Sequence, residues 1–153
     1  MENKIKFMKK ALSLAKKSAK ENEVPIGAVI VIDGKIVATG RNVRNSKNIA
    51  TKHAEIVAIE KACKKLNSWR LENAEMYVTL EPCPMCAGAI VNSRIKKVYF
   101  GAYEKKSGAV LSNHQLLFNN GLNHVVEVEA GLLHDECSQL LKDFFNLCRK
   151  RCE

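Results

Sequence analysis

Apolar residues recur every three or four positions near the start of the chain, within residues 4–20. The positions that repeat in this way are Ile5, Met8, Leu12, Ala15 and Ala19. This spacing matches one face of an α-helix, so it predicts an amphipathic helix that packs on the body of a domain. The lysines between these positions are expected on the solvated face, and direct contact with a nucleic acid is the less favoured alternative.

A different pattern, a short and nearly continuous apolar run rich in Val and Ile, fills residues 26–32. It predicts a strand that is covered on both faces. Asp33 and Gly34 supply a tight turn, after which residues 35–40 return as the partner strand of a hairpin. The stretch at residues 42–48, rich in Asn and Arg, is expected to be a polar, exposed loop.

The rest of the chain alternates between helical and strand patterns. Further strands are expected near residues 75–80, 97–101 and 125–128, and further helices near residues 53–66, 83–91, 113–118 and 133–147. This order predicts an α/β fold, a three-layer α-β-α sandwich in which helices flank a five-stranded mixed sheet. No linker, repeat or low-complexity tract interrupts residues 1–153, so a single domain is expected.

The helix expected at residues 53–66 carries one apolar stripe with alanines beside it. The stripe consists of Ile56, Ile59, Cys63 and Leu66, and the neighbouring alanines are Ala58 and Ala62. Such a stripe is typical of the buried face of a helix. Trp69 and Leu71 are expected to plug the connection to the next strand.

Composition adds a charge argument to this picture. Hydrophobic residues make up 46% of the 153 positions, as in ordinary globular proteins, and no apolar run has membrane-spanning length. No signal core follows the Lys-rich start, so the cytoplasm is the expected location. The net charge of +9, from 25 Lys and Arg against 16 Asp and Glu, favours a polyanionic partner, although a generally Lys-rich composition would have the same effect.

Three of the six cysteines lie in helical patterns, where a buried free thiol is the expected state. They are Cys63, Cys137 and Cys148. This usage fits a reducing compartment.

The chemistry of the chain is concentrated in two short motifs. The first is His53-Ala54-Glu55, and the second is Pro82-Cys83-Pro84-Met85-Cys86. One His and two Cys are the three protein ligands that a catalytic zinc keeps when its fourth position is open, whereas a structural site closes with four. Glu55 is a group of the type that moves protons for such a centre. A Cys-x-x-Cys pair alone would fit a structural or redox site equally well.

The combination resembles the zinc nucleobase deaminases, which share a His-x-Glu motif with a later Pro-Cys-x-x-Cys. Other stretches are similar to those of the bacterial tRNA-specific adenosine deaminases, a family of the cytidine deaminase-like superfamily. They are Val24-Pro-Ile-Gly-Ala-Val29, Thr79-Leu-Glu-Pro-Cys-Pro-Met-Cys86, Ser93-Arg-Ile95, Asp135-Glu-Cys137 and Asp143-Phe-Phe145. The similarity runs from about residue 5 to residue 148.

This resemblance implies a cytidine deaminase-like fold and a cytoplasmic homodimer that converts the wobble adenosine of a tRNA anticodon to inosine. The tRNA implied is an arginine tRNA, recognised through its anticodon stem-loop. One zinc ion per subunit would be bound by His53, Cys83 and Cys86, with Glu55 as the proton shuttle. Zinc would activate a water for attack on C6 of adenine, and a base in an anticodon loop is flipped at little cost.

The resemblance also implies a set of substrate contacts. They fall on Ile26, Asn42, Ala54, Pro82, Tyr103, Glu104, Lys106 and Phe145. Asn42 would contact the flipped nucleoside, residues 104–108 would follow the RNA backbone, and Phe145 would lie near a neighbouring base. The alternatives are core packing for Ile26 and Phe145, a turn role for Asn42, and a solvent-facing Glu104.

Three positions depart from the family pattern. Glu104 stands where Asp is usual, Lys52 replaces a small residue before His53, and Cys148 takes a position often held by Arg. The longer Glu104 side chain and the extra charge of Lys52 both fall beside the expected site.

Two other functions stay open at this stage. The first is a deaminase of free guanine, cytosine or nucleosides, which would need neither a basic surface nor contacts to flanking nucleotides. The second is a zinc-stabilised RNA-binding module without chemistry, for which Glu55 would serve no purpose and a fourth ligand would be expected. Both are less favoured than the tRNA deaminase.

Overall fold

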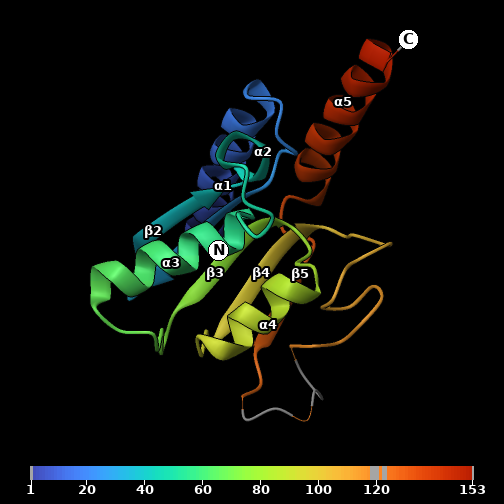
Figure 1. Cartoon of the computed structure of the whole chain (residues 1–153). Helices are drawn as coiled ribbons and strands as arrows, with labels where there is room; N and C mark the ends of the chain where they lie inside the picture. Colours follow the sequence, from blue (N-terminus) through green and yellow to red (C-terminus); the bar gives the residue numbers. More distant parts are fainter. Residues whose placement is uncertain (1, 118–120, 122–123, 153) are drawn as a thin grey trace.

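The computed structural model describes residues 2–117, 121 and 124–152, and its centre is one five-stranded sheet (Figure 1). The strands are β1 (Gly27–Ile32), β2 (Lys35–Arg41), β3 (Glu75–Leu80), β4 (Lys97–Ala102) and β5 (Glu127–Ala130). Their order in the sheet is β2-β1-β3-β4-β5. β1 is antiparallel to β2 and β3, whereas β3, β4 and β5 are parallel, so the sheet is mixed as predicted.

Helices cover both faces of this sheet and give the predicted three layers. α1 (Glu2–Lys20) and α5 (His134–Cys152) pack on one face, and α3 (Ala54–Leu66) and α4 (Pro84–Asn92) pack on the other (Figure 1). Alternate side chains of one strand serve the two cores, because successive residues of a strand point to opposite faces. Ala28 and Ile30 belong to the core under α3 and α4, while Val29 and Val31 belong to the core under α1.

Four strand ends meet at one edge of the sheet and create the place for a site. β3 and β4 run parallel, so the segments after Leu80 and Ala102 leave the sheet at the same edge. β1 begins and β2 ends there as well, since Gly27 lies opposite Arg41 and donates a hydrogen bond to Thr79 Oγ1 at 3.2 Å. Crevices at the carboxyl ends of strands are common ligand sites in α/β sheets.

The prediction of a short helix at residues 113–118 is wrong for residues 113–117, which the structure describes. Residues 113–117 contain one bend, two turn residues and no helix, and Phe118 lies outside the described residues. A short helix occurs instead at α2 (Arg44–Lys47), inside the stretch expected to be a loop. The buried Glu23 carboxylate explains it, because it accepts hydrogen bonds from Asn45 N and Ser46 N at 3.0 and 2.7 Å.

The alanine row is the most deeply buried part of α3, and of the predicted stripe Ile59 and Cys63 pack against the same core while partly buried. Ala54, Ala58 and Ala62 are fully buried, while Leu66 is 40% exposed. The cause is the close approach of β2. A Cβ atom on Gly40 would lie 2.6 Å from Ala58 N and closer still to Ala54 O, so only small residues fit between strand and helix.

The expected plug after α3 is half right. Leu71 is fully buried, but Trp69 is 58% exposed. The guanidinium groups of Arg70 and Arg94 lie over the Trp69 ring, at 4.9 and 5.7 Å from its centroid. Cation–π contacts of this kind hold an aromatic ring at the surface.

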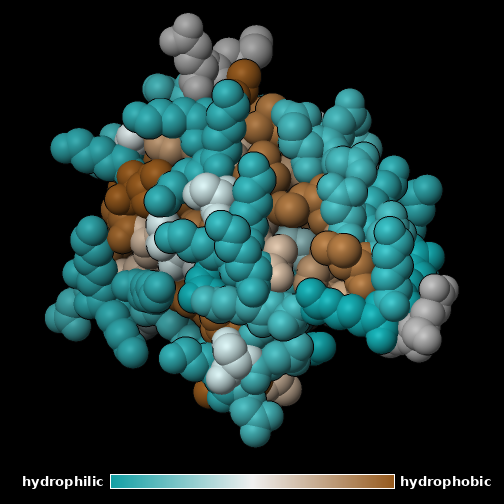
Figure 2. Space-filling model, turned by 90° about the horizontal axis from the view of Figure 1, so that it is seen from above, coloured by the Kyte–Doolittle hydropathy of each residue, from teal (hydrophilic) through white to brown (hydrophobic). Residues whose placement is uncertain are grey.

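The surface seen from above is mixed in character. Figure 2 shows hydrophilic side chains around groups of apolar ones on the side towards which α5 projects in Figure 1. Across the parts of the chain that the structure describes, no helix is both long enough and apolar enough to cross a membrane.

Candidate metal centre

Two helix starts bring the three predicted ligands together. His53 is the residue that caps the N-terminus of α3, and Cys83 has the same place at α4. Both have extended backbones, with φ and ψ of −73° and 158° for His53 and −75° and 172° for Cys83. Cys86 follows in the first turn of α4, where the positive end of the helix favours a thiolate.

The spacing of the ligand atoms fits zinc. His53 Nδ1 lies 3.7 Å from Cys83 Sγ and 3.6 Å from Cys86 Sγ. A tetrahedral zinc about 2.1 Å from nitrogen and about 2.3 Å from sulfur separates such atoms by about 3.6 Å. Among the described residues, this trio is the one group of His, Cys, Asp and Glu that comes close enough to hold a metal ion.

The protonation of the two cysteines supports the same interpretation. The hydrogen bond from the Cys86 thiol, followed by that from His53, lowers the pKa of Cys83 to about 4. The same contact with Cys83, together with burial, raises the pKa of Cys86. The Cys83 thiol is thus the more easily ionised of the two, and a divalent cation bound by both sulfurs would allow both to ionise.

Glu55 lies beside this trio in the first turn of α3. Its side chain is buried, and its Oε1 atom has no hydrogen-bond partner among the described residues. Burial raises the pKa of Glu55 to about 7. A buried carboxylate with an unpartnered oxygen and a pKa near neutrality has the properties of a general acid or base.

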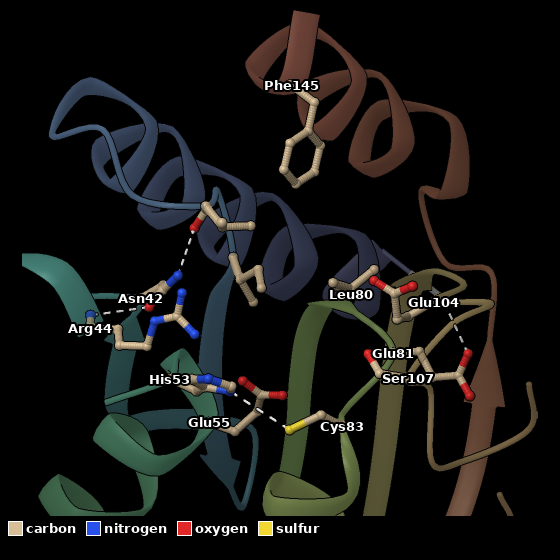
Figure 3. Close-up of a pocket in the computed structure, with 12 residues that line it drawn as sticks. Asn42, Arg44, His53, Glu55, Leu80, Glu81, Cys83, Glu104, Ser107 and Phe145 are labelled. Carbon is tan, nitrogen blue, oxygen red and sulfur yellow. Dashed lines mark hydrogen bonds between the residues drawn. The ribbon is translucent and has the colours of Figure 1, made fainter. Parts of the chain in front are cut away.

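A cavity of about 280 Å³ opens above these groups. Figure 3 shows His53, Glu55 and Cys83 at its floor and Phe145 of α5 pointing towards it from above. The walls come from the strand ends and the segments beside them. The remaining lining residues are Val24, Ile26, Asn42, Arg44, Leu80, Glu81, Glu104 and Ser107.

Four of the predicted substrate contacts line this cavity. They are Ile26, Asn42, Glu104 and Phe145. Ile26 also packs against the core, while Phe145 is 45% exposed, so core packing does not account for Phe145.

The other four predicted contacts are not among the lining residues. Ala54 and Pro82 are buried, and the Pro82 carbonyl accepts a hydrogen bond from Ala109 N at 2.8 Å. Tyr103 is 43% exposed and packs edge-on against the Phe100 ring. The Lys106 backbone N–H donates to the Glu104 carboxylate at 3.1 Å. Contact between these four residues and a substrate stays a prediction.

Asn42 is buried and not exposed as the loop prediction implied. Its side chain donates to the Val24 carbonyl at 3.2 Å and accepts from Arg44 N at 3.2 Å. The second bond forms an Asx-turn, so Asn42 has the turn role and also lies in the cavity wall. The extra charge of Lys52 is balanced, since its ammonium pairs with Glu60 of α3 at 2.5 Å.

Sequence reasoning did not single out Val24, Arg44, Leu80 or Glu81 as site residues, whereas Ser107 lies in the predicted backbone-contacting segment 104–108. A usable signal existed for Arg44, because it lies two positions after Asn42 and is the one Lys or Arg in the described lining. Glu81 offered no comparable signal, since its partners lie more than twenty positions later in the chain.

Comparison with known proteins gives consistent relatives. Residues 2–149 match the sequence profile of a family described as MafB19-like deaminase. The chain is similar to a tRNA-specific adenosine deaminase of Bacillus subtilis (strain 168), with 49% identity over 145 residues, 95% of this chain and 90% of that protein.

Two solved structures extend this comparison. The first comes from a study of A-to-I editing by tRNA:A34 deaminases at the wobble position of transfer RNA; its TM-score is 0.86 and its identity 43%, over 88% of this chain and 98% of that chain. The second is a guanine deaminase from Bacillus subtilis, with a TM-score of 0.61 and 44% identity over 64% of this chain and 63% of that chain.

Proposed function

The chain belongs to the MafB19-like deaminase family, and from that premise we propose that it converts adenosine to inosine at the wobble position of a tRNA anticodon. One observation carries the chemical part of this proposal. The buried Glu55 carboxylate, whose Oε1 atom has no partner among the described residues, lies beside a trio of zinc-type ligands at the floor of a cavity. That arrangement is what hydrolytic replacement of an amine requires.

His53, Cys83 and Cys86 would hold a zinc ion, one per chain. When bound, zinc supplies Lewis acidity that lowers the pKa of a water to about 7. The protein's part is to fix this ion next to Glu55. The His53 ligand and Glu55 are both held by the start of α3, because His53 directly precedes the helix and Glu55 is its second residue.

Glu55 would carry the protons of the reaction. Its carboxylate accepts a proton from the attacking water and passes it to N1 of adenine as C6 is attacked. The proton left on the new C6 hydroxyl would then pass through Glu55 to the amine, so that the C6–N bond breaks as the C6 carbonyl forms, and adenosine and water give inosine and ammonia. Its pKa of about 7 suits both directions of transfer at neutral pH.

The walls of the cavity suggest how a flipped base is held. Asn42 and Arg44 present polar groups on one side, and Glu104 and Ser107 do so on the other (Figure 3). Phe145 stands over the entrance, where an exposed ring can stack on a neighbouring base. Glu104 lines the cavity, and its carboxylate would accept a hydrogen bond from a ribose 2′-hydroxyl, the group that distinguishes RNA from DNA.

The family resemblance extends this proposal to further partners. We propose a cytoplasmic homodimer as the working form and the anticodon stem-loop of an arginine tRNA as the substrate. The net charge of +9 and the exposed basic end of α5, Arg149-Lys150-Arg151, support a polyanionic partner.

A deaminase of free bases is the second candidate, favoured by the likeness to a guanine deaminase. Such an enzyme would use the same metal ligands and the same proton shuttle. It would not use an exposed aromatic ring above the cavity or a basic helix end. A binding module without chemistry fits poorly, because it gives no role to the buried Glu55 carboxylate.

A substrate panel separates these candidates. The zinc-loaded protein is incubated with an anticodon stem-loop, with the same hairpin carrying adenosine one position away, and with free adenosine, cytidine and guanine. Ammonia release from the wobble-adenosine hairpin alone is expected. Release from guanine or cytidine at a higher rate would replace the proposal by free-base deamination, and no release at all would favour the binding module.

A further inference from the structure

Glu81 is a buried carboxylate that the proposed chemistry does not use. It follows β3 and precedes the metal ligand Cys83 by two positions, and its side chain is 2% exposed. Four backbone N–H groups and one hydroxyl donate hydrogen bonds to it. Oε1 accepts from Glu104 N at 3.1 Å and from Ser112 Oγ, and Oε2 accepts from Val110 N, Leu111 N and Ser112 N at 3.2, 2.7 and 2.8 Å.

All five donors belong to one segment, residues 104–112, which follows β4 and contains no regular helix or strand. A loop without such structure must satisfy its backbone groups elsewhere. An ionised carboxylate can do this for several groups, because its two oxygens only accept and offer about four lone-pair positions. Hydrogen bonds to a charged acceptor are also stronger than neutral ones.

The loop is tied to the metal side of the cavity at two further points. Ala109 N donates to the carbonyl of Pro82, the residue between Glu81 and Cys83. Gly108 packs directly on the carboxylate. A Cβ atom at Gly108 would lie 2.5 Å from Glu81 Oε1 and closer still to the Glu104 carbonyl.

The same loop supplies one wall of the cavity through Glu104 and Ser107. Figure 3 shows both residues beside Glu81. The three consecutive residues Glu81, Pro82 and Cys83 therefore connect the metal centre to the wall that faces the substrate. A shift of this loop changes the distance between bound RNA and the reacting centre, and small misplacements are costly in rate.

We propose that Glu81 is a positioning residue that fixes the substrate-facing loop, residues 104–112, relative to the metal centre. The inference rests on the proposed function, because the loop is taken to contact the RNA. Glu81 is not part of the metal-ligand trio, and both of its carboxylate oxygens are occupied by donors of the loop. Its effect on the reaction passes through the loop that it holds.

Glu81→Gln is the first test. An amide keeps one acceptor oxygen and replaces the other by an NH₂ donor, which faces at least one backbone N–H in either orientation. Amide hydrogen exchange in residues 104–112 is expected to accelerate by about tenfold or more, while exchange in β3 and β4 stays as in the unmodified protein. Zinc content is expected to be unchanged, and KM for the anticodon hairpin to rise about tenfold with a smaller fall in kcat.

Gly108→Ala disturbs the same contact, between the Glu81 carboxylate and the loop, by a change in the loop. Its added methyl group displaces the carboxylate, so exchange and KM are expected to change in the same direction as in Glu81→Gln. Because both changes act on one contact, the double variant is expected to raise KM by less than the product of the single effects. Ser112→Ala removes the hydroxyl donor and leaves the backbone intact, and it gives a milder version should the others fold poorly.

Two matched controls accompany these variants. Glu127→Gln removes a carboxylate at an exposed position at the start of β5, at the opposite edge of the sheet. Gly88→Ala adds a methyl group on α4 where it meets no described atom within 4 Å. Neither is expected to alter loop exchange or KM.

The outcomes separate a positioning role from a purely structural one. A lower melting temperature with unchanged loop exchange, KM and kcat would overturn the proposal, and so would loss of zinc as the sole cause of lost activity. If the unmodified protein does not deaminate the hairpin, the proposed function fails, while loop exchange in Glu81→Gln still decides whether Glu81 orders the loop. Faster loop exchange with full zinc content and a raised KM supports the proposal.

Discussion

Cys86 is fully buried in the first turn of α4, and its sulfur lies 3.6 Å from His53 Nδ1. Cys86→Ala removes one of the three ligands of the one group of three or more that, among the described residues, could hold a metal ion. Zinc affinity is expected to fall by at least about a hundredfold, because a site of two ligands no longer encloses the ion. Zinc content of the purified variant, measured against the unmodified protein, tests this. Full occupancy in Cys86→Ala would show that the ligands are wrongly assigned.

The site residues differ in how well the sequence predicts them. His53, Glu55, Cys83 and Cys86 occur in local motifs whose spacing already specifies their chemistry, and the structure brings all four together. Glu81 could not be predicted, because its five donors follow it by 23 to 31 positions and no local pattern marks them.

The burial of a polar site residue, Asn42, was not predicted from the sequence. Asn42 was expected to be exposed because polar stretches commonly are, yet the Val24 carbonyl and Ser18 Oγ hold it in the wall. Tertiary partners of this kind decide the burial of a polar residue, and they are not visible in composition.

Among the elements, the contact between β2 and α3 places His53 and Glu55 at the floor of the cavity. Gly40→Ala forces a methyl group against the backbone of α3, so the free energy of unfolding is expected to fall by about 1–3 kcal/mol. Gly88→Ala is the matched control, since its methyl group meets no described atom within 4 Å and a helix favours Ala by about 0.5–1 kcal/mol. Denaturant titration of both variants measures the difference. A Gly40→Ala variant as stable as the unmodified protein would contradict the packing.

The short α2 depends on Glu23 through hydrogen bonds that are sensitive to pH. Burial alone raises the pKa of Glu23, but the hydrogen bonds from Ser46 and Asn45 and the charge of Arg44 outweigh it and lower the pKa below its usual 4.5. A lowered pKa in the folded state means that Glu23 stabilises the fold above pH 4.5 and that this stabilisation is lost as pH falls further.

Glu23→Gln should therefore be less stable than the unmodified protein at neutral pH. The gap between the two proteins is expected to narrow as pH falls below 4.5, because the protonated carboxyl then resembles the amide. Urea titrations at several pH values measure the gap. A gap that stays constant from neutral to acid pH would contradict an ionised Glu23 in the folded state.

Periodicity predicted the long elements and failed where one element depends on another. The helix near the start, the apolar strand at β1 and the C-terminal helix all carry repeated patterns that hold without knowledge of their neighbours. The alanine face of α3 follows from the close approach of Gly40, and α2 follows from Glu23, which lies about twenty positions earlier. Neither cause appears within the element itself.

For the molecule as a whole, the net charge of +9 is the feature that bears on its partner. Binding of an anticodon stem-loop is expected to weaken by at least about tenfold between roughly 50 and roughly 200 mM salt, because Lys and Arg release counterions from phosphates. Replacing Arg149, Lys150 and Arg151 by Ala should flatten this dependence. Fluorescence anisotropy of a labelled hairpin across salt concentrations measures it. An affinity that does not change with salt would favour a free-base deaminase.

The architecture was predictable because each layer leaves its own mark on the sequence. Strands buried on both faces read as continuous apolar runs, as in β1, while helices that cover a sheet carry one apolar face, as in α1. The sequence does not readily predict that four strand ends meet at one edge of the sheet, because this depends on the order and direction of the strands. Those follow from pairing between distant segments.

Nucleoside analysis of an anticodon hairpin with a wobble adenosine is the measurement that tests the account most directly. The zinc-loaded protein is expected to convert that adenosine to inosine with release of one ammonia. Glu55→Gln is expected to keep its zinc and fold but to lose rate by about a hundredfold to ten-thousandfold, because proton transfer alone is removed. Inosine formed equally fast by Glu55→Gln, or a hairpin left unchanged by zinc-loaded protein, would contradict the assignment.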